Sequence, residues 1–236
     1  SAGSRLLTGG SKILTGLKTR FTNLIFTDAA VWEMTFVGGI DAFGFKQIGA
    51  GSSGIIGPNA ATELNGRVFW MSAKDFYMYD GSVHVIPRSS DNRRFVFDNI
   101  SPTQQDKVVC GLNTLFNEIW WFYADNTGVE INRYIKVNTE DWSWDVGTLT
   151  RTALIDKGVF ANPLMADFNG YVYQHESGVD NDVSAMNEYI TSSILEPVSI
   201  SAVAMIVRDP PPSILRAAPK NLFGLCSALA SMPPDR

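Results

Sequence analysis

Several stretches of this chain are apolar at consecutive positions, so a strand built from them has no polar side to turn toward water. The clearest are Val68 to Met71 and Ile119 to Tyr123, and both are too short to be membrane spans. A strand of this kind is stable only where a sheet is covered on both faces. The chain therefore has to stack its sheets, within itself or against neighbours.

The stretch from about residue 21 to residue 175 predicts an all-β fold, because short apolar runs alternate with turn residues. Four hairpin-like modules open at Asn23, Asn65, Asn117 and Asn169, separated by 42, 52 and 52 residues. Periods of about 40 to 50 residues with about four short strands each are typical of β-propeller blades. We therefore expect a partial β-propeller of about four blade-like antiparallel modules.

Turn and core positions follow from the same pattern. Asn-Gly and Asp-Gly pairs tolerate the positive φ angles of tight hairpins, and aromatic residues inside the doubly apolar runs belong between sheets. The predicted turn residues are Asn65, Gly66, Asp80, Gly81, Asn169 and Gly170. The predicted core residues are Trp70, Phe76, Tyr79, Trp120, Trp121 and Phe122.

The composition changes near residue 197. Six of the eleven prolines lie in the last 27 residues, and the segment 197–236 holds a single aromatic residue, Phe223. Proline cannot donate to a sheet ladder. We expect a lead-in over 1–20, a partial propeller over 21–196, and a proline-rich tail over 197–236, mobile or weakly helical, that is either an assembly arm or encoded out of frame.

Charge and composition limit the function classes. Charged residues make up only 18% of the chain and the net charge is −5, so no general nucleic-acid field is expected. No run approaches the length of a membrane span. The two cysteines, Cys110 and Cys226, match no zinc or disulfide spacing and are interpreted as buried or idle thiols.

The candidate chemical motifs are weak. The Gly49 to Gly54 match to G-x-G-x-x-G precedes Ile-Ile-Gly-Pro rather than a helix start, which favours a flexible connection. His84 and His175 resemble ordinary strand or loop histidines and lack a nucleophile elbow. The segment 143–148 is close to an Asp-box turn, which would support the fold class only.

Two charged clusters remain as candidates. Glu176, Asp180 and Asp182 could form a weak Ca²⁺ site, although a solvated hairpin end fits their spacing better. Arg88, Arg93 and Arg94 could contact phosphate or a neighbouring subunit, although a solvated loop is the simpler interpretation. No cofactor and no catalytic residue is predicted.

The aromatic segments in order resemble a known family. They are residues 55–61, 65–71, 75–81, 94–98, 116–123 and 132–134, followed by Trp142-Ser143-Trp144. In combination they are similar to β-propeller structural proteins at the distal end of short phage tails, called nozzle, tail tubular or packaged-DNA stabilisation proteins. The resemblance runs from about Phe21 to Ser193. It departs before Phe21, where blades are short or absent, and beyond Ser193.

The resemblance implies a non-enzymatic component of a phage tail, in the virion or in the bacterial cytoplasm before assembly. It implies a ring of copies beside portal-adaptor and tail proteins, which closes the DNA channel and then lets the genome pass without sequence-specific contact. An open propeller exposes sheet faces and edges, which argues against autonomous folding. A propeller-type glycan hydrolase or lyase, and a carbohydrate-binding or receptor-binding module, remain the alternatives.

Overall fold

The computed structural model describes residues 5–39, 42–49, 53–178, 180–181 and 184–185. It divides into two compact units, residues 1–175 and residues 176–236. In the second unit the two short strands β16 (Asp180–Asn181) and β17 (Ser184–Ala185) pair antiparallel. The expected boundary at residue 196 and the predicted tail over 197–236 lie outside the described residues.

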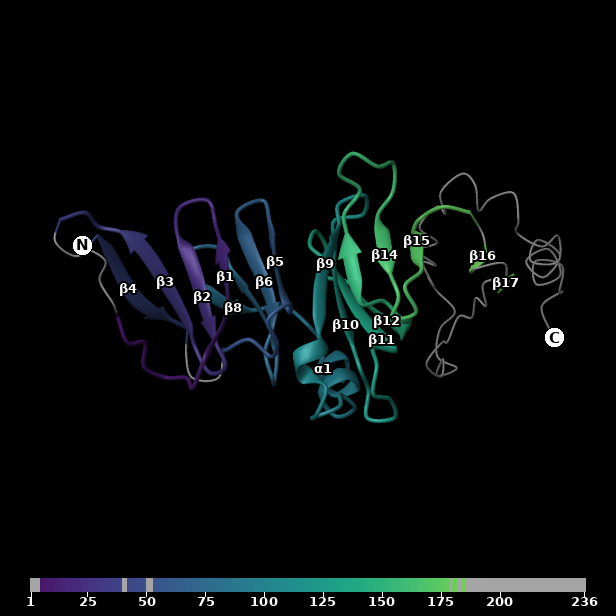
Figure 1. The fold of residues 1–236 in the computed structure, drawn as a ribbon, viewed down its shortest axis with the longest axis horizontal. Helices are drawn as coiled ribbons and strands as arrows, with labels where there is room; N and C mark the ends of the chain where they lie inside the picture. Colours follow the sequence, from purple (N-terminus) through teal and green to yellow (C-terminus); the bar gives the residue numbers. More distant parts are fainter. Residues whose placement is uncertain (1–4, 40–41, 50–52, 179, 182–183, 186–236) are drawn as a thin grey trace, which may run out of the picture. The chain divides into compact units, whose positions relative to one another are not determined.

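The first unit contains four small antiparallel sheets, which follow one another in chain order (Figure 1). The first sheet has β1 (Ile13–Lys18), β2 (Asn23–Thr27), β3 (Val31–Phe36) and β4 (Phe43–Ile48). The second has β5 (Ala61–Leu64), β6 (Arg67–Met71), β7 (Phe76–Tyr79) and β8 (Val83–Val85). The third has β9 (Val109–Asn113), β10 (Glu118–Tyr123), β11 (Arg133–Asn138) and β12 (Trp144–Thr148), and the fourth has β13 (Ala153–Ile155), β14 (Leu164–Ala166) and β15 (Val172–Gln174).

The prediction of a mostly β chain is confirmed, and two expected details are wrong. A short helix, α1 (Ser90–Phe97), occupies the place where a solvated loop was expected; Ser89 caps it by accepting a hydrogen bond from the backbone N–H of Asn92. Strand β1 begins at Ile13, so part of the expected lead-in belongs to the first sheet.

The phase of the repeat also differs from the expected one. The first strands β1, β5, β9 and β13 begin at residues 13, 61, 109 and 153, which gives intervals of 48, 48 and 44 residues. Asn65 and Asn117 lie in the first turn of their sheets, both with positive φ, whereas Asn169 lies in the second turn of the fourth sheet. Each module thus begins one strand or more before the Asn that the sequence pattern predicts as its opening.

Consecutive sheets pack face to face, and the core lies between them. Between the first and second sheets, the Phe26 and Trp70 rings meet edge to face with centroids 5.3 Å apart. Between the second and third, Phe76 lies 5.0 Å from Trp121. The six predicted core residues are all buried, and Trp120 and Phe122 belong to a separate cluster that includes Met165 of the fourth sheet.

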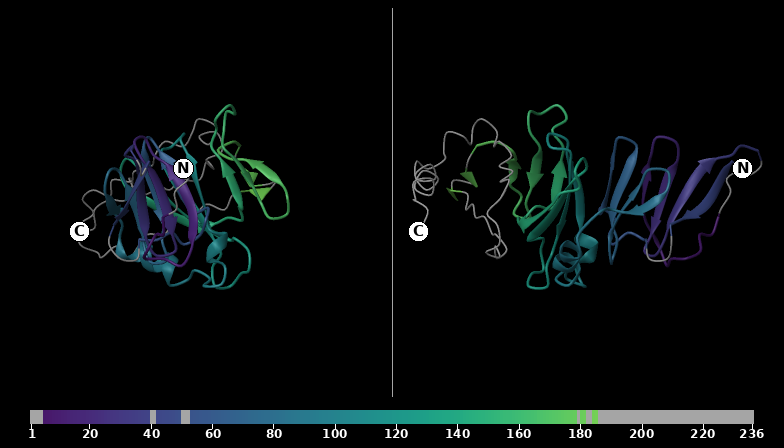
Figure 2. Two further views of the ribbon diagram at one scale, coloured as in Figure 1. Left: turned by 60° about the vertical axis from the view of Figure 1, so that its left-hand side comes forward. Right: turned by 180° about the vertical axis from the view of Figure 1, so that it is seen from behind.

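The first strands of consecutive sheets contact one another: β1 with β5, β5 with β9, and β9 with β13. A parallel bridge between Asn59 and Val109 joins the start of the second sheet to the start of the third, and the Cys110 N–H donates to the Asn59 carbonyl. Figure 2 gives two further views of these sheets. In the first unit, the edge strand that begins each sheet thus lies beside the edge strand that begins the next sheet.

Candidate functional sites

The predicted basic cluster is organised around a carboxylate. Arg88 makes a two-pronged ion pair with Asp75, in which its Nε lies 2.6 Å from Oδ1. The hydrogen bond to Asp75 raises the pKa of the Arg88 guanidinium further. Because its side chain is only 18% exposed and its planar fork already holds a carboxylate, Arg88 is not placed to receive a phosphate.

The other two arginines of that cluster lie on α1. Arg93 donates from Nε to the Lys74 carbonyl at 3.0 Å, and its guanidinium lies 5.9 Å from the Phe97 ring centre. Arg94 is largely exposed and pairs with Asp98 at 3.8 Å. Arg88 and Arg93 therefore tie α1 and the residues before it to the turn between β6 and β7, and Arg94 is the most exposed of the three arginines.

A second polar cluster, which the sequence did not predict, lies in the fourth sheet. Arg151 is 5% exposed, donates from Nε to His175 Nε2 at 2.9 Å, and lies 3.9 Å from the Tyr173 ring centre. Tyr173 in turn donates its hydroxyl to Asp167 at 3.3 Å. No local signal links Arg151 to His175, because 24 residues separate them and only the pairing of β13, β14 and β15 brings them together.

His175 is held in its neutral form. Burial lowers the pKa of His175, and the Arg151 guanidinium lowers it further, to about 4. A neutral ring that accepts at Nε2 carries its proton on Nδ1. This ring serves as a hydrogen-bond acceptor within the sheet rather than as a general base beside a nucleophile.

The other histidine lies in a different sheet from this cluster. His84 is on β8 in the second sheet, half-exposed, with Nε2 2.8 Å from Ser82 Oγ and 3.3 Å from Asp80 Oδ1. The two histidines therefore belong to different sheets. A nucleophile, base and acid arrangement that used both is incompatible with this placement.

A third cluster fixes the loop after β10. Burial alone would raise the pKa of Asp125, but hydrogen bonds from Asn132, Thr127 and Arg133 hold it well below its ordinary value. The same bonds satisfy its carboxylate oxygens. Asp125 therefore holds the β10–β11 connection in shape.

The remaining sequence motifs carry no chemistry in the described residues. The segment Trp144–Thr148 is strand β12, so the Asp-box likeness does not mark a turn there. The Ile55 to Asn59 stretch after the glycine motif is a connection, not a helix. Burial raises the pKa of the Cys110 thiol well above its ordinary value, which disfavours the reactive thiolate; Cys226 lies outside the described residues.

The acidic candidate is described only in part. Glu176 has a positive φ, and for Asp180 the structure gives backbone pairing, whereas Asp182 lies outside the described residues. Among the side chains that the structure places, no three His, Cys, Asp or Glu residues gather as a metal site would require. No helix in the described ranges has the length and apolar character to cross a membrane.

Comparison with known sequences adds no relative. No protein-family model matches the chain, and a search of curated proteins gives no match.

Proposed function

We propose that this chain is a non-enzymatic structural protein of a phage tail, in which the four sheets of the first unit are blades of an incomplete β-propeller. The observation that carries the proposal is the use of both faces of the inner sheets for packing. In β10, Trp121 packs toward the second sheet while Trp120 and Phe122 pack toward the fourth. Together with the row of contacting first strands, this is the packing that blades around a common axis require.

The distribution of charges supports a structural role. Asp75 with Arg88, Asp125 with Arg133, and Glu118 with Lys136 each join segments of the fold, and the Arg151–His175 pair does the same in the fourth sheet. Glu118 is 7% exposed and also accepts a hydrogen bond from the Trp120 indole. Charged side chains that bond to other parts of the fold in this way stabilise its shape and are already engaged within the protein.

The tail role rests on the likeness of the aromatic segments to short-tail nozzle proteins. In that role several copies form a ring next to portal-adaptor and tail proteins, the ring closes the DNA channel, and the genome later passes through it. DNA passage through such a ring needs no base-specific contacts. The protein would be found in the virion, and in the bacterial cytoplasm before assembly.

Sequencing the DNA on either side of the gene tests this role. We expect genes for a portal, a terminase or an adaptor, because virion components are encoded together. Flanking genes for polysaccharide uptake or degradation would contradict the tail role. Turnover of a bacterial polysaccharide that disappears when one Asp or Glu is substituted would favour a glycan hydrolase or lyase instead.

A further inference from the structure

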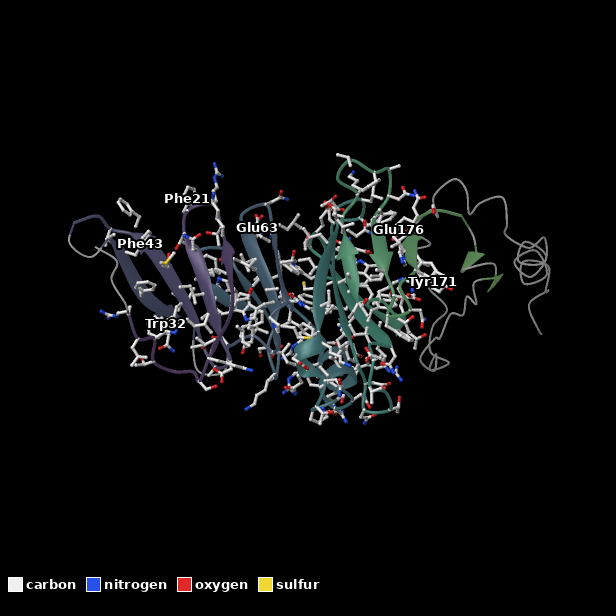
Figure 3. The ribbon with its side chains drawn as sticks, viewed as in Figure 1. Phe21, Trp32, Phe43, Glu63, Tyr171 and Glu176 are labelled. Atoms are coloured by element: carbon white, nitrogen blue, oxygen red, sulfur yellow. The ribbon has the colours of Figure 1, made fainter. Side chains whose placement is uncertain are left out.

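The first sheet has an apolar face that no other sheet covers within the described residues. Register places Phe36 opposite Phe43 and Met34 opposite Phe45, on the same side as Ile25 and Trp32. We call these six residues the first-sheet outer face. Phe36 and Phe43 are 75% and 47% exposed, whereas Leu24, Phe26 and Val31 on the opposite side are buried against the second sheet. Figure 3 labels Phe43 and Trp32 on the first sheet.

A buried donor on this face lacks an acceptor. Trp32 is 9% exposed, and its indole N–H has no hydrogen-bond partner in the part of the chain that is described. In the inner sheets the corresponding donors are satisfied by connecting segments: Trp70 donates to the Ser53 carbonyl at 2.8 Å and Trp121 to the Ala60 carbonyl at 3.2 Å. An unpaired buried N–H destabilises a protein. This face therefore resembles one half of a junction between sheets, without the segment that would supply the acceptor.

The fourth sheet has the matching feature on its far side. Leu154 and Met165 pack toward the third sheet. Register places the alternate residues on the other side, and these are almost all apolar: Ala153, Ile155, Leu164, Ala166, Val172 and Gln174. We call them the fourth-sheet outer face. Ile155 is 59% exposed and Val172 is 67% exposed.

We propose that the first-sheet outer face of one copy packs on the fourth-sheet outer face of the next copy, head to tail. The inference rests on the proposed ring function and names the surfaces that would build the ring. The partner is a second copy because each junction between the sheets of the first unit joins two apolar sheet faces, and the proposed contact is of the same kind. It covers both outer faces at once, whereas a two-fold pairing of the first-sheet outer face would leave the fourth sheet uncovered.

The charges on the two faces are compatible with this contact. Among the residues of these strands, Lys18 is the single charged residue that register places on either outer face, because Glu33 and Lys46 lie on the inner side of the first sheet. The contact therefore buries few charges and opposes no like pair. A head-to-tail contact repeated from copy to copy closes into a ring when its rotation allows and otherwise grows as a filament.

Mixing two variants of the full chain tests the contact, because a head-to-tail junction can be complemented. One variant carries Phe36→Glu with Phe43→Glu, and the other carries Ile155→Glu with Val172→Glu. We expect an oligomer from the wild type, a monomer from each variant alone, and a one-to-one dimer from the mixture, measured by light scattering after size exclusion. A control with Phe21→Glu and Val129→Glu, both highly exposed positions, should keep the wild-type mass.

Three results would contradict the proposal, and each would contradict a different part of it. A monomeric wild type overturns both the inference and the ring. A wild-type ring that neither variant breaks overturns the inference alone. If the fourth-sheet variant dimerises by itself and mixing adds no species, the first-sheet face pairs with itself and the inference is wrong.

A crosslinking measurement covers the case in which a glutamate variant does not fold. Phe43→Cys and Val172→Cys are made as separate proteins. Under oxidation, the proposal expects covalent dimers in the mixture and none beyond the wild-type background in either protein alone. Equal crosslinking in the mixture and in one protein alone contradicts it.

Discussion

Tyr123 shows at the scale of one residue how the third sheet departs from ideal packing. Its side chain is fully buried, and its hydroxyl has no hydrogen-bond partner among the residues that the structure places. Burial raises the pKa of Tyr123 to about 12, so the phenol stays neutral at any ordinary pH. In the unfolded chain this hydroxyl bonds to water, so leaving it unpaired in the core destabilises the folded state.

We predict that Tyr123→Phe stabilises the protein by about 1 kcal/mol, because it removes the unpaired hydroxyl and keeps the ring. Urea unfolding of the two proteins measures the difference. Tyr79→Phe is the matched control, since its hydroxyl donates to Glu33 at 3.4 Å and its loss should not stabilise. A Tyr123→Phe protein less stable than the wild type would show that the hydroxyl is bonded.

His175 makes stability depend on pH. The pKa of His175 is about 4 in the folded chain and about 6.5 in an unfolded one. Between these values the unfolded chain binds more protons, so the stability contributed by the neutral ring is complete above about pH 6.5 and is lost as the pH falls toward 4. We expect the melting temperature to fall from pH 7 to pH 5, and His175→Gln to reduce that fall.

If His175→Gln keeps the wild-type slope, the ring is not held neutral by Arg151 and burial.

The sequence predicts which single residues are buried better than it predicts which residues they contact. Trp70, Trp121 and Phe122 were placed in the core correctly because consecutive apolar residues leave no polar face. The partners of buried charges were not predicted. Asp75 with Arg88 and Arg151 with His175 depend on which strands pair, and that is a property of the folded chain.

At the scale of elements, α1 and β1 show why two segments were misjudged. The first turn of α1 is polar throughout and lacks a helical apolar repeat, so its capping residue Ser89 was the only signal. Strand β1 contains Gly16, which weakens a strand interior, and it is held in the sheet by its pairing with β2. Both elements depend on tertiary contacts more than on local sequence.

The junction between the third and fourth sheets depends on a glycine. A Cβ on Gly111 of β9 would lie 2.1 Å from Leu154 Cδ2 and 3.1 Å from Leu154 Cβ, so the whole leucine side chain would have to move. We predict that Gly111→Ala costs about 1 to 3 kcal/mol through overpacking. Chemical denaturation of the variant measures the loss.

Leu154→Ala supplies the control for this junction. In a Gly111→Ala background it removes the clash, so the double variant should be less destabilised than the sum of the two single changes. If the losses of stability of the two single variants simply add in the double variant, β9 and β13 do not approach each other as closely as in this structure.

At the scale of the whole molecule, the repeat predicted the number of modules but not their phase. Asn-Gly pairs show where hairpin turns fall, and the same pair can serve the first turn of one sheet and the second turn of another. The intervals of 48, 48 and 44 residues between first strands emerge only when the pairing is known. The strands that are apolar on both faces predict the architecture better than the Asn-Gly repeat does. Such strands must be buried on both faces, and stacked sheets achieve this.

The proposed role requires the stacked sheets to assemble into a closed ring of copies. Electron microscopy of the purified chain in negative stain tests this requirement. We expect closed rings whose central opening is wide enough to admit double-stranded DNA. A field of single copies, or of two-fold dimers without an opening, would contradict it.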